Sequence, residues 1–328
     1  MNLEKMHDVG IVGGGAAGLS AAVALARSLR SVVVVDGGDP RNAPAAGAHN
    51  VLGHDGIAPA ELMAGGRREA EHYGAQIRRG RAIAARRRNG GFEVDLAGGG
   101  SIRARRLLLA TGLTDELPAV PGVREFWGRS VLHCAYCHGW EVRGRRIGVL
   151  GTSPLSVHQA LLFRQLNDDV TLFLNTMPAP GAEASEQLAA RDIRVVHGAV
   201  DRLRGDNDAV SAVVLDDDRE FPVDAVTVAP RFLARAELYE QLGGTLVEHP
   251  LGAFIATGPM GLTDIPGVWA AGNASGLGAM VAAAMGAGVA AGAAINADLV
   301  TEDAEAAVRA RAERTAPSTE TRDDAVAQ

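Results

Sequence analysis

The glycine spacing near the N-terminus restricts the fold of this chain more than any other feature of its sequence. Gly13, Gly15 and Gly18 follow a short apolar run and precede an Ala-rich helical pattern. In such a strand–turn–helix unit, the first glycine permits the tight turn, the second lets the backbone approach a pyrophosphate, and the third lets helix and strand pack closely. The next apolar run ends in Asp36, where a carboxylate can bind ribose hydroxyls. The sequence therefore predicts a dinucleotide-binding unit.

A second strand–turn–helix pattern begins at 146–150, and the composition of the first unit returns near Leu246. We therefore predict an α/β fold of two Rossmann-like domains, with the second inserted in the first. A chain of 328 residues is long enough for both. The predicted boundaries are 1–117 and 246–300 for the two parts of the first domain, 118–245 for the insertion, and 301–328 for a helical or disordered tail.

Composition and charge exclude several functions. The net charge of −7 argues against nucleic-acid binding. Lys5 is the only lysine, so the chain lacks a P-loop lysine and an internal Schiff-base lysine. Because no charged segment followed by an apolar stretch opens the sequence, we expect a cytoplasmic protein. The uncharged stretch 274–297 consists mostly of Ala and Gly, and we expect a buried helix there rather than a membrane span.

Reactive side chains are concentrated around the only two cysteines, Cys134 and Cys137. A zinc site would need both adjacent histidines as ligands, and a structural disulfide across so short a loop would stabilise weakly. A redox-active dithiol is the favoured interpretation, with no metal expected. His138 is a candidate proton shuttle beside the thiolate, whereas a structural role is favoured for His133.

Taken in order, these motifs resemble those of the low-molecular-weight thioredoxin reductases. The glycine turn, Ala110-Thr111-Gly112, the C-x-x-C pair and Ala271-Gly272-Asn273 (in place of Ala-Gly-Asp) lie within residues 7–300. The resemblance implies FAD in the first domain, a redox disulfide in the second, and a homodimer. It also implies that Cys137 is the flavin-side sulfur and Cys134 the sulfur that exchanges with substrate. The implied FAD contacts are Gly13, Gly15, Ala16, Ala17, Gly18, Asp36, Gly37, Arg41, Asn42, Asn50, Ala110, Thr111, Gly112, Gly272, Asn273, Val281 and Ala282.

Three departures from the reductases change the functional expectation. Their second glycine motif is replaced by Gly151-Thr152-Ser153-Pro154, in which Ser153 carries a side chain where a pyrophosphate would approach. The following stretch, 172–177, has no cation for the 2′-phosphate of NADPH, so NADPH is a doubtful cofactor. His138 stands where the reductases have aspartate, and the sequence around it resembles the flavin dithiol oxidases of the gliotoxin and holomycin type.

These observations predict a FAD-dependent dithiol oxidase that closes a disulfide in a small natural product, with O2 as the final acceptor. In that reaction a substrate thiolate attacks Cys134, the second substrate thiol resolves the mixed disulfide, and Cys137 passes electrons to the flavin. His138 would move the protons. Two alternatives stay open: a reductase of a thioredoxin-like protein supplied by NADPH or another donor, and a flavin redox sensor without turnover.

Overall fold

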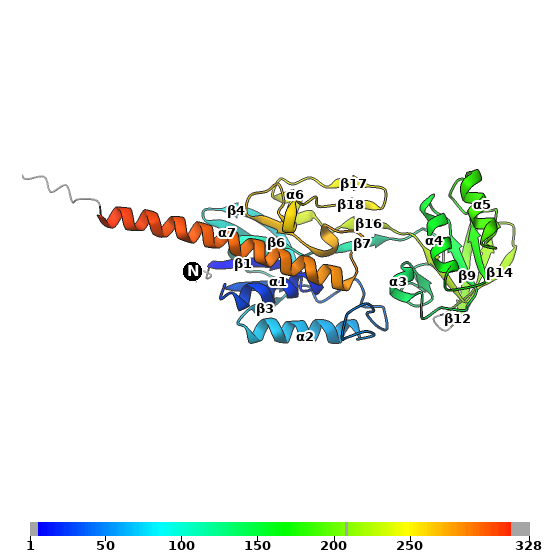
Figure 1. Cartoon of the computed structure of the whole chain (residues 1–328), viewed down its shortest axis with the longest axis horizontal. Helices are drawn as coiled ribbons and strands as arrows, with labels where there is room; N and C mark the ends of the chain where they lie inside the picture. Colours follow the sequence, from blue (N-terminus) through cyan, green and yellow to red (C-terminus); the bar gives the residue numbers. More distant parts are fainter. Residues whose placement is uncertain (1–5, 207–208, 316–328) are drawn as a thin grey trace, which may run out of the picture.

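The computed structural model describes residues 6–206 and 209–315, which form two α/β units that lie side by side along the long axis of the molecule (Figure 1). The first unit is built on a seven-stranded sheet. Its strands are β1 (Met6–Val12), β2 (Val32–Asp36), β3 (Gln76–Arg79), β4 (Ala82–Arg88), β5 (Gly91–Leu96), β6 (Ser101–Leu109) and β19 (Val268–Ala270). The order is β3-β2-β1-β6-β5-β4, with β19 also paired to β6.

The central strands of this sheet are parallel, and β4 and β5 form an antiparallel hairpin that continues into β6. Every residue of β2 is buried, as expected for a Val-rich parallel strand that is covered on both faces. The covering helices are α1 (Ala16–Arg27), α2 (Pro59–His72) and α7 (Val281–Thr315). This arrangement brings the ends of β1, β2 and β6 to one edge of the sheet.

The second unit has a five-stranded parallel sheet in the order β11-β10-β9-β15-β8 and a three-stranded antiparallel sheet in the order β12-β13-β14. The strands are β8 (Val131–Leu132), β9 (Ile147–Leu150), β10 (Val170–Phe173), β11 (Arg194–Val196), β12 (Val200–Asp206), β13 (Ala209–Leu215), β14 (Glu220–Pro222) and β15 (Ala225–Val228). The helices are α3 (Ala135–His138), α4 (Leu155–Arg164) and α5 (Ala182–Ala190). The prediction of two Rossmann-like domains is confirmed.

A four-stranded sheet in the order β17-β18-β16-β7 connects the units. It consists of β7 (Leu113–Glu116), β16 (Arg231–Ala234), β17 (Val247–His249) and β18 (Gly252–Phe254). The short helix α6 (Glu237–Gln241) follows β16, and two 3₁₀ turns, η1 (Pro259–Gly261) and η2 (Gly272–Ala274), flank β19. In Figure 1, β7 and β16 are the adjacent strands that run between the two units.

The chain returns to the first unit earlier than the expected position 246. β16 pairs antiparallel with β7, and Leu238 and Tyr239 of α6 are buried in the core of the first unit. The early return depends on pairing between strands that are far apart in the sequence, and no local motif predicts such a pairing. At the other end, α7 continues unbroken to Thr315, so no boundary separates residue 300 from 301. The remainder of the expected tail, 316–328, lies outside the described residues.

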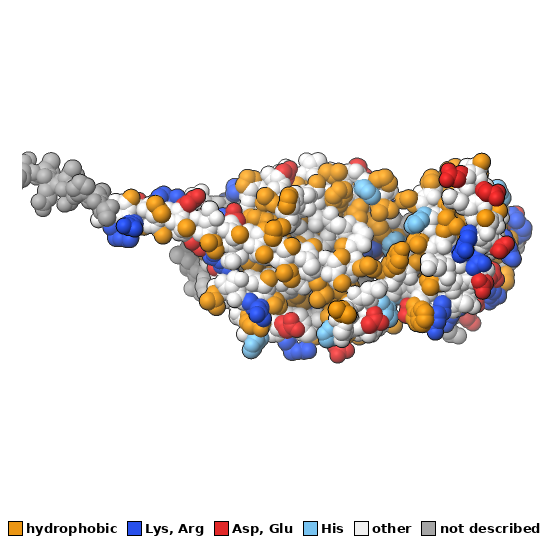
Figure 2. All heavy atoms as spheres, viewed as in Figure 1, with side chains coloured by type: hydrophobic (Ala, Val, Ile, Leu, Met, Phe, Trp, Pro, Cys, Tyr) orange, Lys and Arg blue, Asp and Glu red, His pale blue; other side chains and the backbone are white. Residues whose placement is uncertain are grey.

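One face of α7 explains the Ala/Gly-rich stretch of the sequence. Ala284, Gly288, Ala291, Ile295 and Leu299 are buried at helical spacing, while the opposite face is exposed. The length and apolar composition of α7 alone would fit a membrane span. Its buried face, however, packs against α1, the element with which α7 has its most extensive contact. Figure 2 shows hydrophobic side chains over the face that carries α7, while many charged side chains gather on the second unit.

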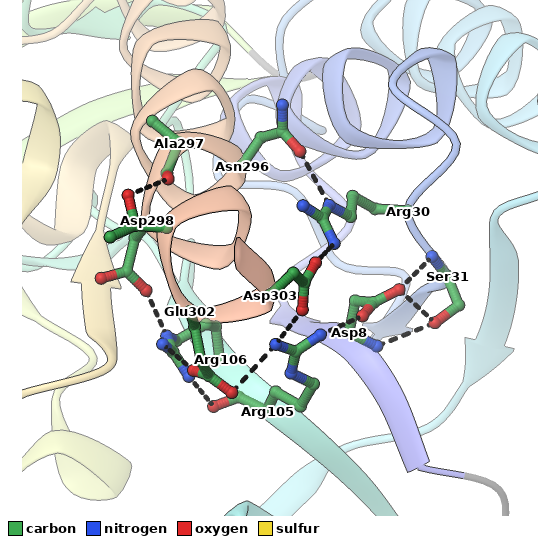
Figure 3. A network of polar contacts seen from close by, with 11 residues as sticks. Asp8, Arg30, Ser31, Arg105, Arg106, Asn296, Ala297, Asp298, Glu302 and Asp303 are labelled. Carbon is green, nitrogen blue, oxygen red and sulfur yellow. Dashed lines mark hydrogen bonds and ion pairs between the residues drawn. The ribbon is translucent and has the colours of Figure 1, made fainter. Parts of the chain in front are cut away.

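Ion pairs attach the middle of α7 to β6 and to the segment that follows α1 (Figure 3). Arg105 on β6 contacts Asp303 at 2.6 Å and Glu302 at 2.9 Å. The neighbouring Arg106 donates from Nε to Asp298 at 2.5 Å, and Arg30, which follows α1, contacts Asp303 at 2.6 Å. The arginine side chains are largely shielded from solvent, so this network fixes the direction in which the exposed end of α7 leaves the body.

The α1–α7 contact predicts opposite effects for two glycines of the same helix. A Cβ on Gly288 would lie 2.0 Å from the carbonyl oxygen of Ala17, whereas a Cβ on Gly286 would meet nothing within 4 Å. Gly288→Ala should therefore lower the free energy of unfolding by about 1–3 kcal/mol through overpacking. Gly286→Ala, the matched control, should raise it by up to about 1 kcal/mol, because alanine favours the helix. Urea denaturation measures both, and equal effects would contradict the close packing.

Candidate active site

A cavity of about 1180 Å³ lies where the two units meet, at the carboxyl edge of the seven-stranded sheet. The turn after β1, the end of β2 and the segment after β6 supply part of its wall. The segment that follows β8 supplies Cys134, Cys137 and His138 to the same cavity. Open α/β sheets bind ligands at this edge, because the strand ends and helix N-termini converge there.

The glycine turn has the geometry that a bound pyrophosphate requires. Gly13 has φ +111°, and a Cβ there would lie 2.1 Å from the carbonyl oxygen of Ala110. A Cβ on Gly18 would lie 1.9 Å from the oxygen of Gly13, so this glycine permits the close helix–strand contact. A Cβ on Gly15 would meet nothing within 4 Å, and no side chain caps α1 at that residue. The N–H groups that begin α1 therefore face open space suited to an anion.

Most of the expected FAD contacts line this cavity: Gly13, Gly15, Ala16, Ala17, Asp36, Gly37, Arg41, Asn42, Ala110, Thr111, Gly112, Gly272, Asn273 and Val281. Three do not. Gly18 packs between α1 and β1, and Ala282 is exposed at the start of α7. Asn50 has a left-handed backbone (φ 60°) and donates from Nδ2 to the carbonyl oxygen of Tyr136 at 2.8 Å. Its amide thus contacts the cysteine segment rather than the cavity wall.

Charged groups at the cavity are held by partners that the sequence does not reveal. Asp36 accepts the Gly38 N–H at 2.8 Å and a bond from Arg67 at 3.1 Å. Arg67 also lines the cavity, but it belongs to α2 and to no recognisable motif, so sequence reasoning missed it. Arg41 makes a two-point ion pair with Asp115 on β7, with distances of 2.8 and 2.6 Å. Its guanidinium is thereby tied to the strand that leaves the first unit.

Asn273 organises the turn that leads into α7. Its Nδ2 donates to the carbonyl oxygens of Gly276 at 3.1 Å and Ala279 at 3.0 Å. The aspartate that thioredoxin reductases carry at this point could not donate these bonds, because an ionised carboxylate only accepts. The adjacent Gly272 has φ +71°, which favours glycine. The substitution therefore stabilises the local backbone while keeping the residue on the cavity wall.

The two cysteines form a disulfide on the cavity wall. Their Cα atoms are 5.2 Å apart, and Sγ of Cys134 accepts the N–H of Cys137 at 3.1 Å at the start of α3. Gln159 on α4 donates to the carbonyl oxygen of His133 at 2.9 Å and so ties down the residue before the pair. Within the described ranges, no group of three or more His, Cys, Asp or Glu side chains is placed to hold a metal ion.

The two histidines beside the disulfide differ in environment. Burial, followed by the charge of Arg41, lowers the pKa of His133 to about 4, and its ring packs edge-on against Phe232 at 5.0 Å. Burial also lowers the pKa of His138, although the charge of Glu141 opposes it. His138 lines the cavity, and its buried Nε2 has no hydrogen-bond partner among the described residues. A neutral imidazole in this position is suited to accept a proton.

The low pKa of His133 predicts acid destabilisation. The unfolded chain takes up a proton near pH 6.5 that the native state resists until about pH 4, so the free energy of unfolding should fall as the pH decreases through that window. His133→Gln should flatten this fall by up to about 3 kcal/mol. Urea titrations at a series of pH values measure it, with the exposed His54→Gln as control. An unchanged slope in His133→Gln would contradict the assignment.

With this geometry established, comparison with known proteins identifies the family. The family model described as pyridine nucleotide-disulphide oxidoreductase matches residues 7–288. The chain is a pyridine nucleotide-disulphide oxidoreductase. Among curated relatives, thioredoxin reductase tcpT of Claviceps purpurea is 34% identical and covers 83% of this chain and 88% of its own length. Thioredoxin reductase sirT of Leptosphaeria maculans is 31% identical, with 89% and 94% covered.

Solved structures of two further proteins are similar to this oxidoreductase over most of its length. The crystal structure of HlmI is similar with a TM-score of 0.89 and 44% identity, over 95% of this chain and 98% of that one. An oxidoreductase from Agrobacterium tumefaciens has a TM-score of 0.86 and 38% identity, over 90% and 99%. The predicted resemblance to thioredoxin reductase-type flavoproteins is confirmed, and the chain is a FAD-binding enzyme of that type. The glycine turn described above fits this cofactor.

In the second unit, the carboxyl ends of β9 and β10 differ from the glycine turn of the first unit. A Cβ on Gly151 would lie 2.6 Å from the carbonyl oxygens of Phe173 and Leu174, so the turn after β9 is tightly closed. Asn175, at the end of β10, accepts the backbone N–H of Val200 at 3.0 Å. The nearby hollow, of about 350 Å³, has neither Lys nor Arg among the described residues that line it. His158 is the basic side chain among these lining residues, so a 2′-phosphate there would have no guanidinium or ammonium partner within the described lining.

Proposed function

We propose that this flavoprotein is a dithiol oxidase that closes a disulfide in a small natural product, with O2 as the final acceptor. The observation that carries the proposal is that the Cys134–Cys137 disulfide lines the same cavity as the FAD turn, while no described Lys or Arg lines the hollow of the second unit where NADPH would bind. Tyr136 lies between the two cysteines in sequence and Trp140 follows them, and both exposed aromatic side chains offer contact area to a small apolar substrate.

The sulfur chemistry balances with O2 as the only external oxidant. A substrate thiolate bonds to Sγ of Cys134 and breaks the bond to Cys137, which leaves as a thiolate. The second substrate thiol then displaces Cys134, so the substrate is oxidised by two electrons and the cysteine pair is reduced by two. When bound, FAD would supply the route by which the two electrons leave the dithiol for O2, which would be reduced to hydrogen peroxide. The protein itself provides placement of the sulfurs and control of the protons.

His138 is the group that fits the proton transfers. It is kept neutral by burial, lines the cavity and follows Cys137 directly. It would accept a proton from an attacking substrate thiol and return one to a departing sulfur. His133 is held against Phe232 and tied through its carbonyl to Gln159, so we assign it to positioning of the segment.

An anaerobic titration separates the proposed oxidase from a reductase. Dithiothreitol should bleach the flavin absorbance at a rate that supports turnover, because the disulfide is open to a small dithiol. NADPH should bleach it at least about 100-fold more slowly, because its 2′-phosphate would forfeit charge-assisted bonds, each worth roughly 1.5–3 kcal/mol. Stopped-flow absorbance measures both rates, and Cys134→Ser serves as the control that should not respond to dithiothreitol.

Rapid bleaching by NADPH with little response to dithiothreitol would instead support a thioredoxin reductase. Bleaching by dithiothreitol without peroxide formation in air would support a redox sensor.

We further propose a cytoplasmic homodimer, on the strength of the family resemblance and of the exposed apolar residues Val289 and Val300 on α7. Light scattering should then give about twice the chain mass of 33.9 kDa.

A further inference from the structure

A loop of the first unit, residues 37–58, contacts the cysteine segment through two neighbouring side chains. Asn50 donates to the carbonyl oxygen of Tyr136, which lies between the two cysteines in sequence. His49 directs Nε2 toward Oε1 of Glu141 at 3.5 Å. Because the loop belongs to the FAD-binding unit and the segment to the other, both contacts fix the disulfide relative to the flavin side of the cavity.

Asp55 holds His49 in the orientation that this contact requires. Its Oδ2 lies 3.2 Å from Nδ1 of His49, and its Oδ1 accepts the backbone N–H of Asn50 at 2.9 Å. That backbone bond and the His49 ring lower the pKa of Asp55, so its carboxylate is charged under ordinary conditions. The two nitrogens of His49 thus face two carboxylates, one from its own loop and one from the cysteine segment.

The charge of Glu141 also acts on a second imidazole, that of His138, which lies three residues before it in the same segment. The charge of Glu141 raises the pKa of His138 against the effect of burial, and His49 lowers it. His133 is the other titratable ring that interacts with His138. Glu141 therefore connects the loop that docks the segment to the side chain proposed to transfer protons, and His49 and Glu141 act on that side chain in opposite directions.

We propose that Glu141 and His49 are positioning residues for thiol exchange: they hold the disulfide segment, and with it His138, against the FAD-binding unit. This inference rests on the proposed exchange at Cys134. Neither residue needs to touch the substrate. Their contribution is to keep the attacked sulfur and the proton acceptor together in the arrangement in which the disulfide faces the FAD site.

The test is the pH dependence of flavin bleaching by dithiothreitol under anaerobic conditions. Glu141→Gln should move the acid limb of the profile to lower pH and reduce the limiting rate by roughly tenfold, less than the 10²–10⁴-fold expected for loss of an acid–base group itself. His49→Gln should move the limb to higher pH. Glu141→Asp keeps the charge and should return the limb toward that of the unmodified protein.

Two further measurements keep the outcomes distinct. The ring protons of His138 can be titrated by NMR in the oxidised protein, with His138→Gln to assign them, and should show the same opposite shifts without any turnover. Glu183→Gln changes an exposed carboxylate on α5 of the same unit and should alter neither profile. FAD content per chain, read from visible absorbance, verifies that each variant is folded.

Shifts of the same sign in Glu141→Gln and His49→Gln, or a uniform loss of rate with no shift in either readout, would overturn the positioning role. If the unmodified flavin does not respond to dithiothreitol at all, the proposed oxidase fails. The NMR titration would in that case still decide whether Glu141 and His49 control His138. If Glu141→Gln loses FAD, the signs found for His49→Gln and Glu141→Asp settle the inference.

Discussion

The antiparallel pairing of β7 with β16 is the constraint on which the site depends. These strands carry the chain out of the first unit and back, with Leu113 opposite Ala234 and Glu116 opposite Arg231. Because β7 and β16, the two strands that run between the units, lie side by side, they hold the second unit at the carboxyl edge of the seven-stranded sheet. Arg41 reinforces the crossing by pairing with Asp115 on β7 while it lies over Phe232 of β16. The disulfide segment therefore faces the FAD turn.

Features encoded by local spacing could be predicted from the sequence. The glycine turn needs only residues 13–18 and the strand before it, and the C-x-x-C pair needs only four residues. The Ala/Gly stretch indicated close helix packing because small residues recur along it, although only one stripe of α7 is buried. These features place the FAD site and the disulfide in the correct units, and their order along the chain was enough to identify the family.

Features formed by contacts between distant residues could not be predicted in this way. Arg67 reaches Asp36 from α2, Asn50 reaches Tyr136 across 86 positions, and the return at β16 depends on a partner strand far earlier in the chain. Nothing in the local sequence distinguishes these side chains from ordinary surface residues. Asn50 illustrates the consequence: the sequence predicts a FAD contact there, and the structure adds a bond from its amide to the redox segment that no local pattern indicates.

We expect the flavin ring to lie against the Cys134–Cys137 disulfide in the cavity between the two units. A crystal structure of the oxidised, FAD-loaded protein tests this arrangement most directly. It should show the isoalloxazine ring within van der Waals contact of Cys137 Sγ, with the pyrophosphate at the N-terminus of α1. A structure in which the ring is bound elsewhere, or in which the disulfide lies far from it with no rotation able to bring the two together, would contradict the account.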